Sequence, residues 1–160
     1  MKVPIECPVF RKYLQKVIPD AFDVNGLMDT EHEWVLCREM IDIEGLDVRS
    51  LVGIEHFINL SALDIDNNPK IKHLPRLPNT LKTFHSNHEF KKSVQPVFFY
   101  NMGVFVMLDN GRILWGSGSW DSLDEFKAWV GKIDKVSQFS PFIAKCKRFS
   151  NKIKNKTDEK

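Results

Sequence analysis

Cysteine is scarce in this chain of 160 residues, and its three copies, Cys7, Cys37 and Cys146, are far apart. An odd number of widely spaced cysteines argues against a disulfide framework and against a C-x-x-C metal site. Long apolar runs are missing as well. No segment approaches ~18 uninterrupted apolar residues, and the first residues contain no apolar run of signal-peptide length. We therefore expect no membrane span, a soluble protein and a cytoplasmic location.

Recognisable catalytic motifs are equally hard to find. The run Gly116-Ser117-Gly118-Ser119 lacks the lysine of a phosphate-binding loop and the strand-turn-helix setting of a nucleophile elbow. Cys37 has no neighbour that marks it as a nucleophile. His85 and His88, beside Glu89, are three residues apart, but on an extended strand they would point to opposite faces. The sequence predicts no catalytic residues, no metal site and no cofactor, so we expect no enzyme.

Charge is present but unevenly distributed. The chain is 42% hydrophobic and 28% charged, which is typical of a globular protein, and its formal net charge is +2. Residues 144–160 contain seven Lys or Arg and two acids, a balance of +5, so the rest of the chain carries −3. A basic C-terminal tail of this kind can bind nucleic acid or an anionic membrane through phosphate groups. It is also typical of a solvated, fraying terminus, and both interpretations stay open.

The most specific pattern lies near the middle of the chain. Its spacing, L-x-x-L-x-L-x-x-N, is typical of leucine-rich repeats, and it is carried by Leu60, Leu63, Ile65 and Asn68, followed by Ile71 and Leu74. In a strand, Leu63 and Ile65 point to one side and Asp64 and Asp66 to the other. We expect the Asn68 amide to bond backbone groups of the following turn.

Degenerate copies of the pattern flank the middle one. Twenty-one residues after Leu63 stands Phe84, and 22 residues before it stands Ile41, so the period lies within the usual range of this repeat class. The outer copies are imperfect, since Ser86 stands where Ile65 predicts an aliphatic residue. The pattern predicts that the segments holding Ile43, Ile65 and Phe84 lie side by side as parallel strands.

A family resemblance rests on longer runs of sequence. Val9-Phe10-Arg11-Lys12-Tyr13-Leu14, Phe22-Asp23-Val24-Asn25-Gly26 and the segment 50–64, S-L-V-G-I-E-H-F-I-N-L-S-A-L-D, together resemble bacterial leucine-rich-repeat proteins of the internalin-like kind. The segment 74–81, L-P-R-L-P-N-T-L, is similar to the L-P-x-L-P repeats of secreted bacterial effectors. The resemblance covers about residues 9–89. It implies a fold and a binding role, and it carries no catalytic residues to this chain.

The chain departs from that family in its calcium-loop-like segment. With Asp23 at the first ligand position, position 5 is Leu27 and position 12 is Trp34, and the register set by Gly26 begins on Ala21. Neither register supplies enough oxygen ligands for calcium. We expect Asp23-Val24-Asn25-Gly26 to form only a turn.

A different pattern begins near Ser93. Residues 97–100 and 104–108 are rich in β-branched and aromatic residues, and Asp109-Asn110-Gly111 is typical of a tight turn, so a β-hairpin is predicted over residues 104–115 and ends at the glycine-serine run. Ser122 with Glu125 forms a capping-box pattern ahead of a helix that begins near residue 123. A further short helix is predicted from about Pro141, within residues 139–149.

The sequence thus predicts an α/β fold built around a short leucine-rich-repeat solenoid of about three parallel strands. Its predicted parts are a helical N-terminal cap (1–37), the repeats (38–92), a β-hairpin and helix (93–143) and the basic tail (144–160). The leading functional hypothesis is a non-enzymatic module that binds another protein, one with a basic surface, through Asp42, Glu44, Asp64, Asp66, His85 and Asn87. The alternatives are an immunity, anti-defence or effector-type inhibitor, and nucleic-acid or membrane association through the tail.

Overall fold

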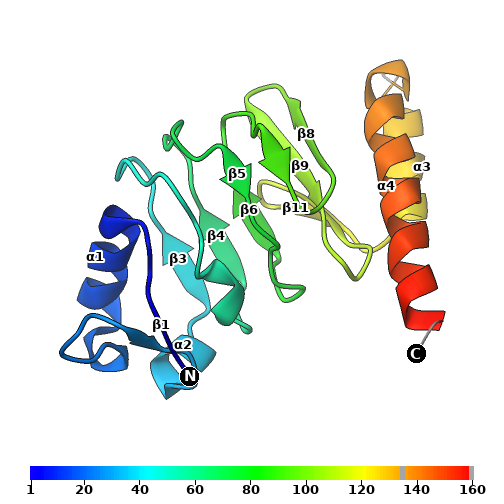
Figure 1. Cartoon of the computed structure of the whole chain (residues 1–160). Coiled ribbons are helices and arrows are strands. Elements are labelled where there is room, and N and C mark those ends of the chain that lie inside the picture. Colours follow the sequence, from blue (N-terminus) through cyan, green and yellow to red (C-terminus); the bar gives the residue numbers. More distant parts are fainter. Residues whose placement is uncertain (134–135, 159–160) are drawn as a thin grey trace.

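A computed structural model describes residues 1–133 and 136–158. Figure 1 shows the elements following one another along the molecule, from α1 at one end to the paired helices α3 and α4 at the other. The helices are α1 (Pro8–Val17), α2 (Glu33–Leu36), α3 (Leu123–Lys132) and α4 (Val136–Asp158), with short 3-10 turns η1 (Pro19–Ala21) and η2 (Ile54–His56). The N-terminal region, residues 1–37, also contains a short antiparallel pair, β1 (Lys2–Val3) and β2 (Met28–Asp29).

A three-stranded parallel sheet follows, formed by β3 (Met40–Asp42), β4 (Ala62–Asp64) and β6 (Thr83–His85). Ile41 lies opposite Leu63, and Leu63 lies opposite Phe84, so the expected parallel alignment of these three segments is confirmed. Two further short strands, β5 (His73–Leu74) and β7 (Lys92–Ser93), form a separate parallel pair.

The largest sheet is antiparallel. Its four strands are β8 (Val97–Tyr100), β9 (Gly103–Met107), β10 (Ile113–Trp115) and β11 (Gly118–Trp120), in the order β11-β10-β9-β8. The predicted hairpin is confirmed, with Ile113 opposite Met107 across the turn that contains Asn110 and Gly111. The hairpin ends at Trp115, directly before the glycine-serine run, as predicted. The sequence did not predict that Gly116 and Ser117 turn the chain into a further strand, β11.

The predicted fold class, a short leucine-rich-repeat solenoid, is wrong. The protein is an α/β structure with several sheets, and the four-stranded antiparallel sheet is the largest of them. The reason lies in the turns after residue 96. Asn101 and Met102 both have positive φ (48° and 62°). They form a two-residue turn between Tyr100 and Gly103, which lie opposite each other in β8 and β9. A two-residue turn of this kind can only join antiparallel neighbours, because parallel strands need a long crossover.

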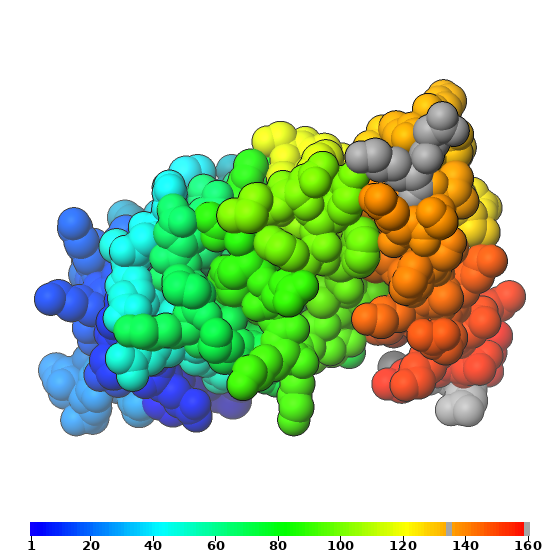
Figure 2. Space-filling view, turned by 90° about the horizontal axis from the view of Figure 1, so that it is seen from above, coloured from blue at the N-terminus to red at the C-terminus, as the bar shows by residue number. Residues whose placement is uncertain are grey.

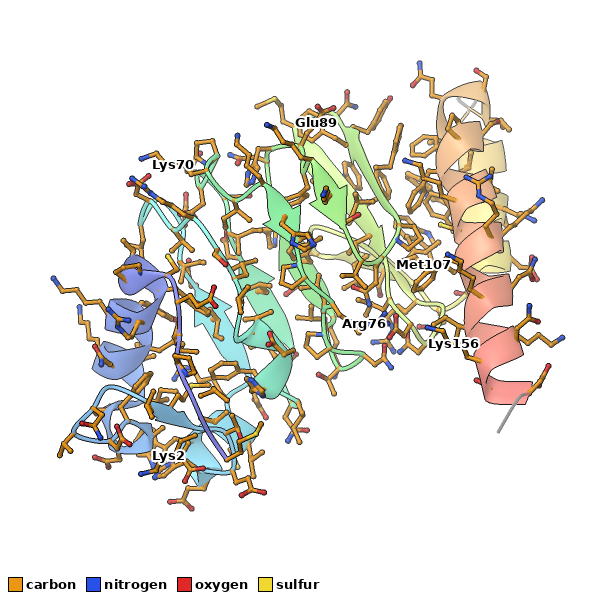
Figure 3. The ribbon with its side chains drawn as sticks, in the orientation of Figure 1. Lys2, Lys70, Arg76, Glu89, Met107 and Lys156 are labelled. Carbon is orange, nitrogen blue, oxygen red and sulfur yellow. The ribbon has the colours of Figure 1, made fainter. Side chains whose placement is uncertain are left out.

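The antiparallel sheet separates two apolar cores. Val104 and Val106 on one face of β9 belong to a core that begins at Ile5 and includes the buried residues of the parallel sheet. Phe105 and Met107 on the other face pack with Phe126 of α3 and with the buried face of α4. Because side chains alternate between the two faces of a strand, β9 can be buried on both sides. Figure 3 shows Met107 between the sheet and α4.

The helix α3 begins as the sequence predicts. The N–H of Glu125 donates to Oγ of Ser122 (3.2 Å), and Oε2 of Glu125 accepts from the N–H of Asp121 (2.9 Å). The first bond satisfies a backbone donor that the first helical turn leaves free, and the second satisfies the N–H of the residue just before the cap. The cap fixes where α3 starts, and Phe126 and Val130 are then buried against the sheet.

Two of the three predicted boundaries cut through regular elements. The boundary between residues 92 and 93 falls inside β7, and the one between 143 and 144 falls inside α4. Residues 144–158 are therefore the continuation of a 23-residue helix, whereas the predicted short helix covered only 139–149. Phe139, Phe142 and Cys146 are buried one turn apart and hold this helix on the sheet. The last two residues of the predicted tail, 159–160, and residues 134–135 of the preceding region lie outside the described residues.

Candidate protein-binding face

The parallel sheet buries one side and leaves the other accessible. Ile41, Leu63 and Phe84 point into the core and are fully or almost fully buried. Their neighbours along each strand point outward, because successive side chains alternate in a strand. Asp42, Asp64 and His85 stand at matching positions on the three strands and so form one row across this outer side.

The same turn follows β3 and β4 and extends the row. Oδ1 of Asp42 accepts from the N–H of Glu44 (3.1 Å), and Oδ1 of Asp64 accepts from the N–H of Asp66 (3.0 Å). An aspartate that bonds the backbone two residues ahead turns the chain locally. As a result three carboxylates lie close together. Their nearest oxygen atoms, one from each of Asp42, Glu44 and Asp64, are within 4.8 Å of one another.

We call Asp42, Glu44, Asp64, Asp66, His85 and Asn87 the acidic face. Among the described residues, none of its four carboxylates forms an ion pair with a lysine or arginine. Burial raises the pKa of Asp66, and repulsion from Asp64, Glu44 and Asp42 raises it further, while His85 acts in the opposite direction. The face is thus a concentration of negative charge with little compensation inside the molecule.

Asn87 and His85 mark the far edge of the acidic face. Asn87 exchanges two hydrogen bonds with Asn67: its Oδ1 accepts from the Asn67 N–H (3.0 Å) and its Nδ2 donates to the Asn67 Oδ1 (2.9 Å). Asn67 in turn donates from Nδ2 to Oε1 of Glu44 (3.2 Å). The His85 ring lies 3.4 Å from Oγ of Ser117 in the β10–β11 turn. The structure therefore brings all six sequence-predicted binding residues to one side.

The residues predicted to be structural lie behind this face. Asn68 has an exposed fraction of 0% although it is polar. Its Oδ1 accepts from the N–H of Val48 (2.8 Å), and its Nδ2 donates to the carbonyl oxygens of Ile43 (2.8 Å), Ile65 (3.2 Å) and Asp66 (3.0 Å). This amide thereby ties the turn after β4 to the turn after β3. The apolar members of the set are all buried: Leu60, Leu63, Ile65, Ile71 and Leu74.

Sequence reasoning missed an apolar cleft next to the acidic face. Met40 is 55% exposed and precedes Asp42 by two residues, so both side chains leave β3 on the same side. Trp34, from α2, is 48% exposed. Both line a cleft of about 490 Å³ together with Glu33, Cys37, Arg38 and Glu39. The only sequence signal was the alternation Met40-Ile41-Asp42-Ile43, which puts Met40 outward while Ile41 is buried.

The remaining candidates from the sequence are separated from one another. His88 lies within hydrogen-bonding distance of the Ile71 carbonyl (3.2 Å between Nε2 and O), whereas His85 faces Ser117. Burial lowers the pKa of His88. The segment 23–26 forms the expected turn, with Oδ1 of Asp23 accepting from the N–H groups of Asn25 (2.9 Å) and Leu27 (3.0 Å).

Across the described parts of the chain, no helix combines the length and apolarity needed to cross a membrane. Comparison with known proteins found no matching protein family, no matching curated protein and no matching solved structure. The resemblance to internalin-like proteins therefore stays a prediction.

Proposed function

We propose that this protein works without catalysis, by binding another protein through the acidic face and the adjoining cleft. The observation that carries the proposal is the row of carboxylates in register on β3 and β4, unpaired with any lysine or arginine of the described residues. Crowded like charges repel one another, and a cationic surface relieves that repulsion. The partner therefore presents lysine and arginine side chains.

The apolar cleft favours a protein partner over a lone cation. A metal ion held by Asp42, Glu44 and Asp64 would leave Trp34 and Met40 in water. A protein partner can place an apolar side chain in the cleft while its cations meet the carboxylates. Buried aromatic and methionine side chains with charged groups around them are the usual composition of protein interfaces. The charged groups set orientation and association rate, and the apolar anchor supplies much of the affinity.

A neutralising variant tests this assignment. Asp64→Asn/Asp66→Asn removes two charges but keeps an oxygen at residue 64 that accepts from the residue 66 N–H. The control variant, Asp124→Asn/Asp158→Asn, also removes two negative charges, but from α3 and α4, outside the acidic face. Each variant and the wild-type chain are immobilised and exposed to host lysate, bound proteins are quantified by mass spectrometry, and the candidate is purified and titrated by calorimetry.

The expected result is a protein bound by the wild-type chain and the control, with affinity weakened about tenfold or more in the Asp64/Asp66 variant and falling with salt. In the same titration, Trp34→Ala should bind the partner more weakly than the wild-type chain does, even at high salt. Salt screens attraction between charges but not an apolar contact. Equal binding by the wild-type chain, the Asp64/Asp66 variant and the Asp124/Asp158 control contradicts the proposal. So does the absence of a specific partner in the lysate.

A further inference from the structure

A groove runs between α4 and the segment that leads from β7 into β8. It has a volume of about 340 Å³, and it is lined on one side by residues 93–96 and on the other by Lys145, Arg148, Phe149 and Lys152. Figure 2 shows the corresponding hollow between the green segment and the orange-red helix. A second hollow of about 280 Å³ shares Lys145 and continues along β8. Neither belongs to the acidic face.

Within residues 1–133 and 136–158, the cations of this groove have no anionic partners. Among the described residues, Lys145, Arg148 and Lys152 form no ion pair. The exposed Lys91 and Lys92 lie on the adjoining segment, and they too are unpaired among the described residues. The whole helix α4 has six Lys or Arg and one Asp, a balance of +5. A bound polyanion would therefore meet free charges and break no existing ion pair.

The cations also recur regularly. Lys145, Arg148, Lys152 and Lys156 are three or four residues apart, which places them on one flank of α4 with about one cation per 5.4 Å turn. Figure 3 labels Lys156 near the C-terminal end of this helix. A row of this kind suits a ligand whose negative charges repeat along its length.

We propose that this groove binds the sugar-phosphate backbone of nucleic acid. The apolar face of α4 is occupied, since Phe139, Phe142 and Cys146 are buried against the sheet and α3, so the helix cannot insert that face into a lipid bilayer. Phe149 is partly buried against the same core, which leaves the groove without an exposed aromatic platform for bases. Contacts to phosphates without contacts to bases give binding that is independent of sequence.

The chain supplies a matched pair of variants. Lys145→Ala/Lys152→Ala removes two lysines from the groove, seven residues apart on α4. Lys147→Ala/Lys154→Ala removes two exposed lysines with the same spacing from the other flank of the same helix. Binding to a fluorescein-labelled 20-base-pair DNA duplex is followed by anisotropy at several salt concentrations, and thermal melting checks that both variants fold equally.

The groove variant is expected to bind at least about tenfold more weakly than the wild-type chain. The slope of log K against log salt should become shallower by about 2, since each lost phosphate contact contributes about 0.9. The Lys147/Lys154 control should stay much closer to the wild-type chain in both quantities. Asp64→Asn/Asp66→Asn should retain duplex binding, which keeps this test independent of the proposed protein-binding role.

Three outcomes overturn the proposal. The first is equal weakening by the two lysine pairs, which would mean diffuse attraction to α4 as a whole. The second is binding to phosphatidylserine vesicles with no binding to duplex or single-stranded nucleic acid. The third is a groove-dependent dimer in light scattering with no nucleic-acid binding, which would assign the groove to the acidic face of a second copy.

Discussion

At the scale of single residues, Asn68 connects the sequence pattern to the structure. Its position in the spacing predicted an amide that satisfies backbone groups of a turn, and the buried side chain does so through four hydrogen bonds. Trp34 and Met40 were not predictable as a cleft. Whether an apolar side chain is buried depends on which element covers it, and local spacing contains little information about that.

Replacing Asn68 tests its structural role. Asn68→Ala leaves the buried N–H of Val48 without its acceptor, and an unsatisfied buried group costs about 1–3 kcal/mol. It also removes the amide donor from the carbonyl oxygens of Ile43, Ile65 and Asp66, although that of Ile43 still accepts from the N–H of Leu46. We expect the free energy of unfolding to fall by about 2–4 kcal/mol in urea titrations. Asn68→Asp should also be destabilised, because a carboxylate cannot donate to those carbonyls. A loss below about 0.5 kcal/mol for the alanine variant would contradict this role.

The stability of the folded protein should depend on pH through Asp66. The folded state raises the pKa of Asp66, so folding favours its protonated form, and stability is lost as the pH rises through that pKa. Asp66→Asn should therefore be more stable than the wild-type chain at pH 7. Below pH ~4, where the wild-type carboxyl is neutral too, the difference should vanish. Melting curves between pH 3 and 8 measure this, and a variant that is less stable at pH 7 would contradict it.

At the scale of elements, α4 shows how composition can conceal a regular structure. Residues 144–158 are rich in lysine, and this composition suggested a solvated tail. The apolar positions Phe139, Phe142 and Cys146 have helical spacing and continue into the partly buried Ile143 and Phe149. The hairpin and the cap of α3 were predictable because each has a short, local chemical cause. The packing of α4 was not, because it depends on a sheet face built earlier in the chain.

The reaction rates of the three thiols test how α4 packs. Burial raises the pKa of Cys146 to about 12, while Cys37 is exposed. At Cys7 burial opposes ionisation, but backbone hydrogen bonds, that of Arg49 first, outweigh it and lower the pKa, so Cys7 is slow only because its side chain is buried and closed to the reagent. Only a thiolate reacts quickly with a disulfide reagent. At pH 8 the native protein should therefore show one fast thiol per chain, and Cys37→Ser should abolish it. Phe142→Ala should cost about 3–5 kcal/mol of stability and speed the reaction of Cys146. A fast Cys146 in the native chain would mean that α4 does not pack as described.

At the scale of the whole molecule, the small net charge of +2 conceals two surfaces of opposite sign. Acids gather on the outer side of β3 and β4, and cations gather along α4. The local spacing near Leu63 correctly predicted three parallel segments, but it contained no information about the strands that follow. Those strands are joined by tight turns at Asn101-Met102 and Asn110-Gly111, and so the largest sheet is antiparallel and the solenoid prediction fails.

Hydrogen exchange in the presence of a purified protein partner tests the central claim most directly. Peptides covering residues 32–46, 62–68 and 83–88 contain the cleft and the acidic face, and their amides should exchange more slowly when the partner is bound. Peptides from α1 and α3 should be unchanged. Protection confined to α4 and residues 91–96, with none on the parallel strands, would contradict the account and assign protein binding to the basic groove.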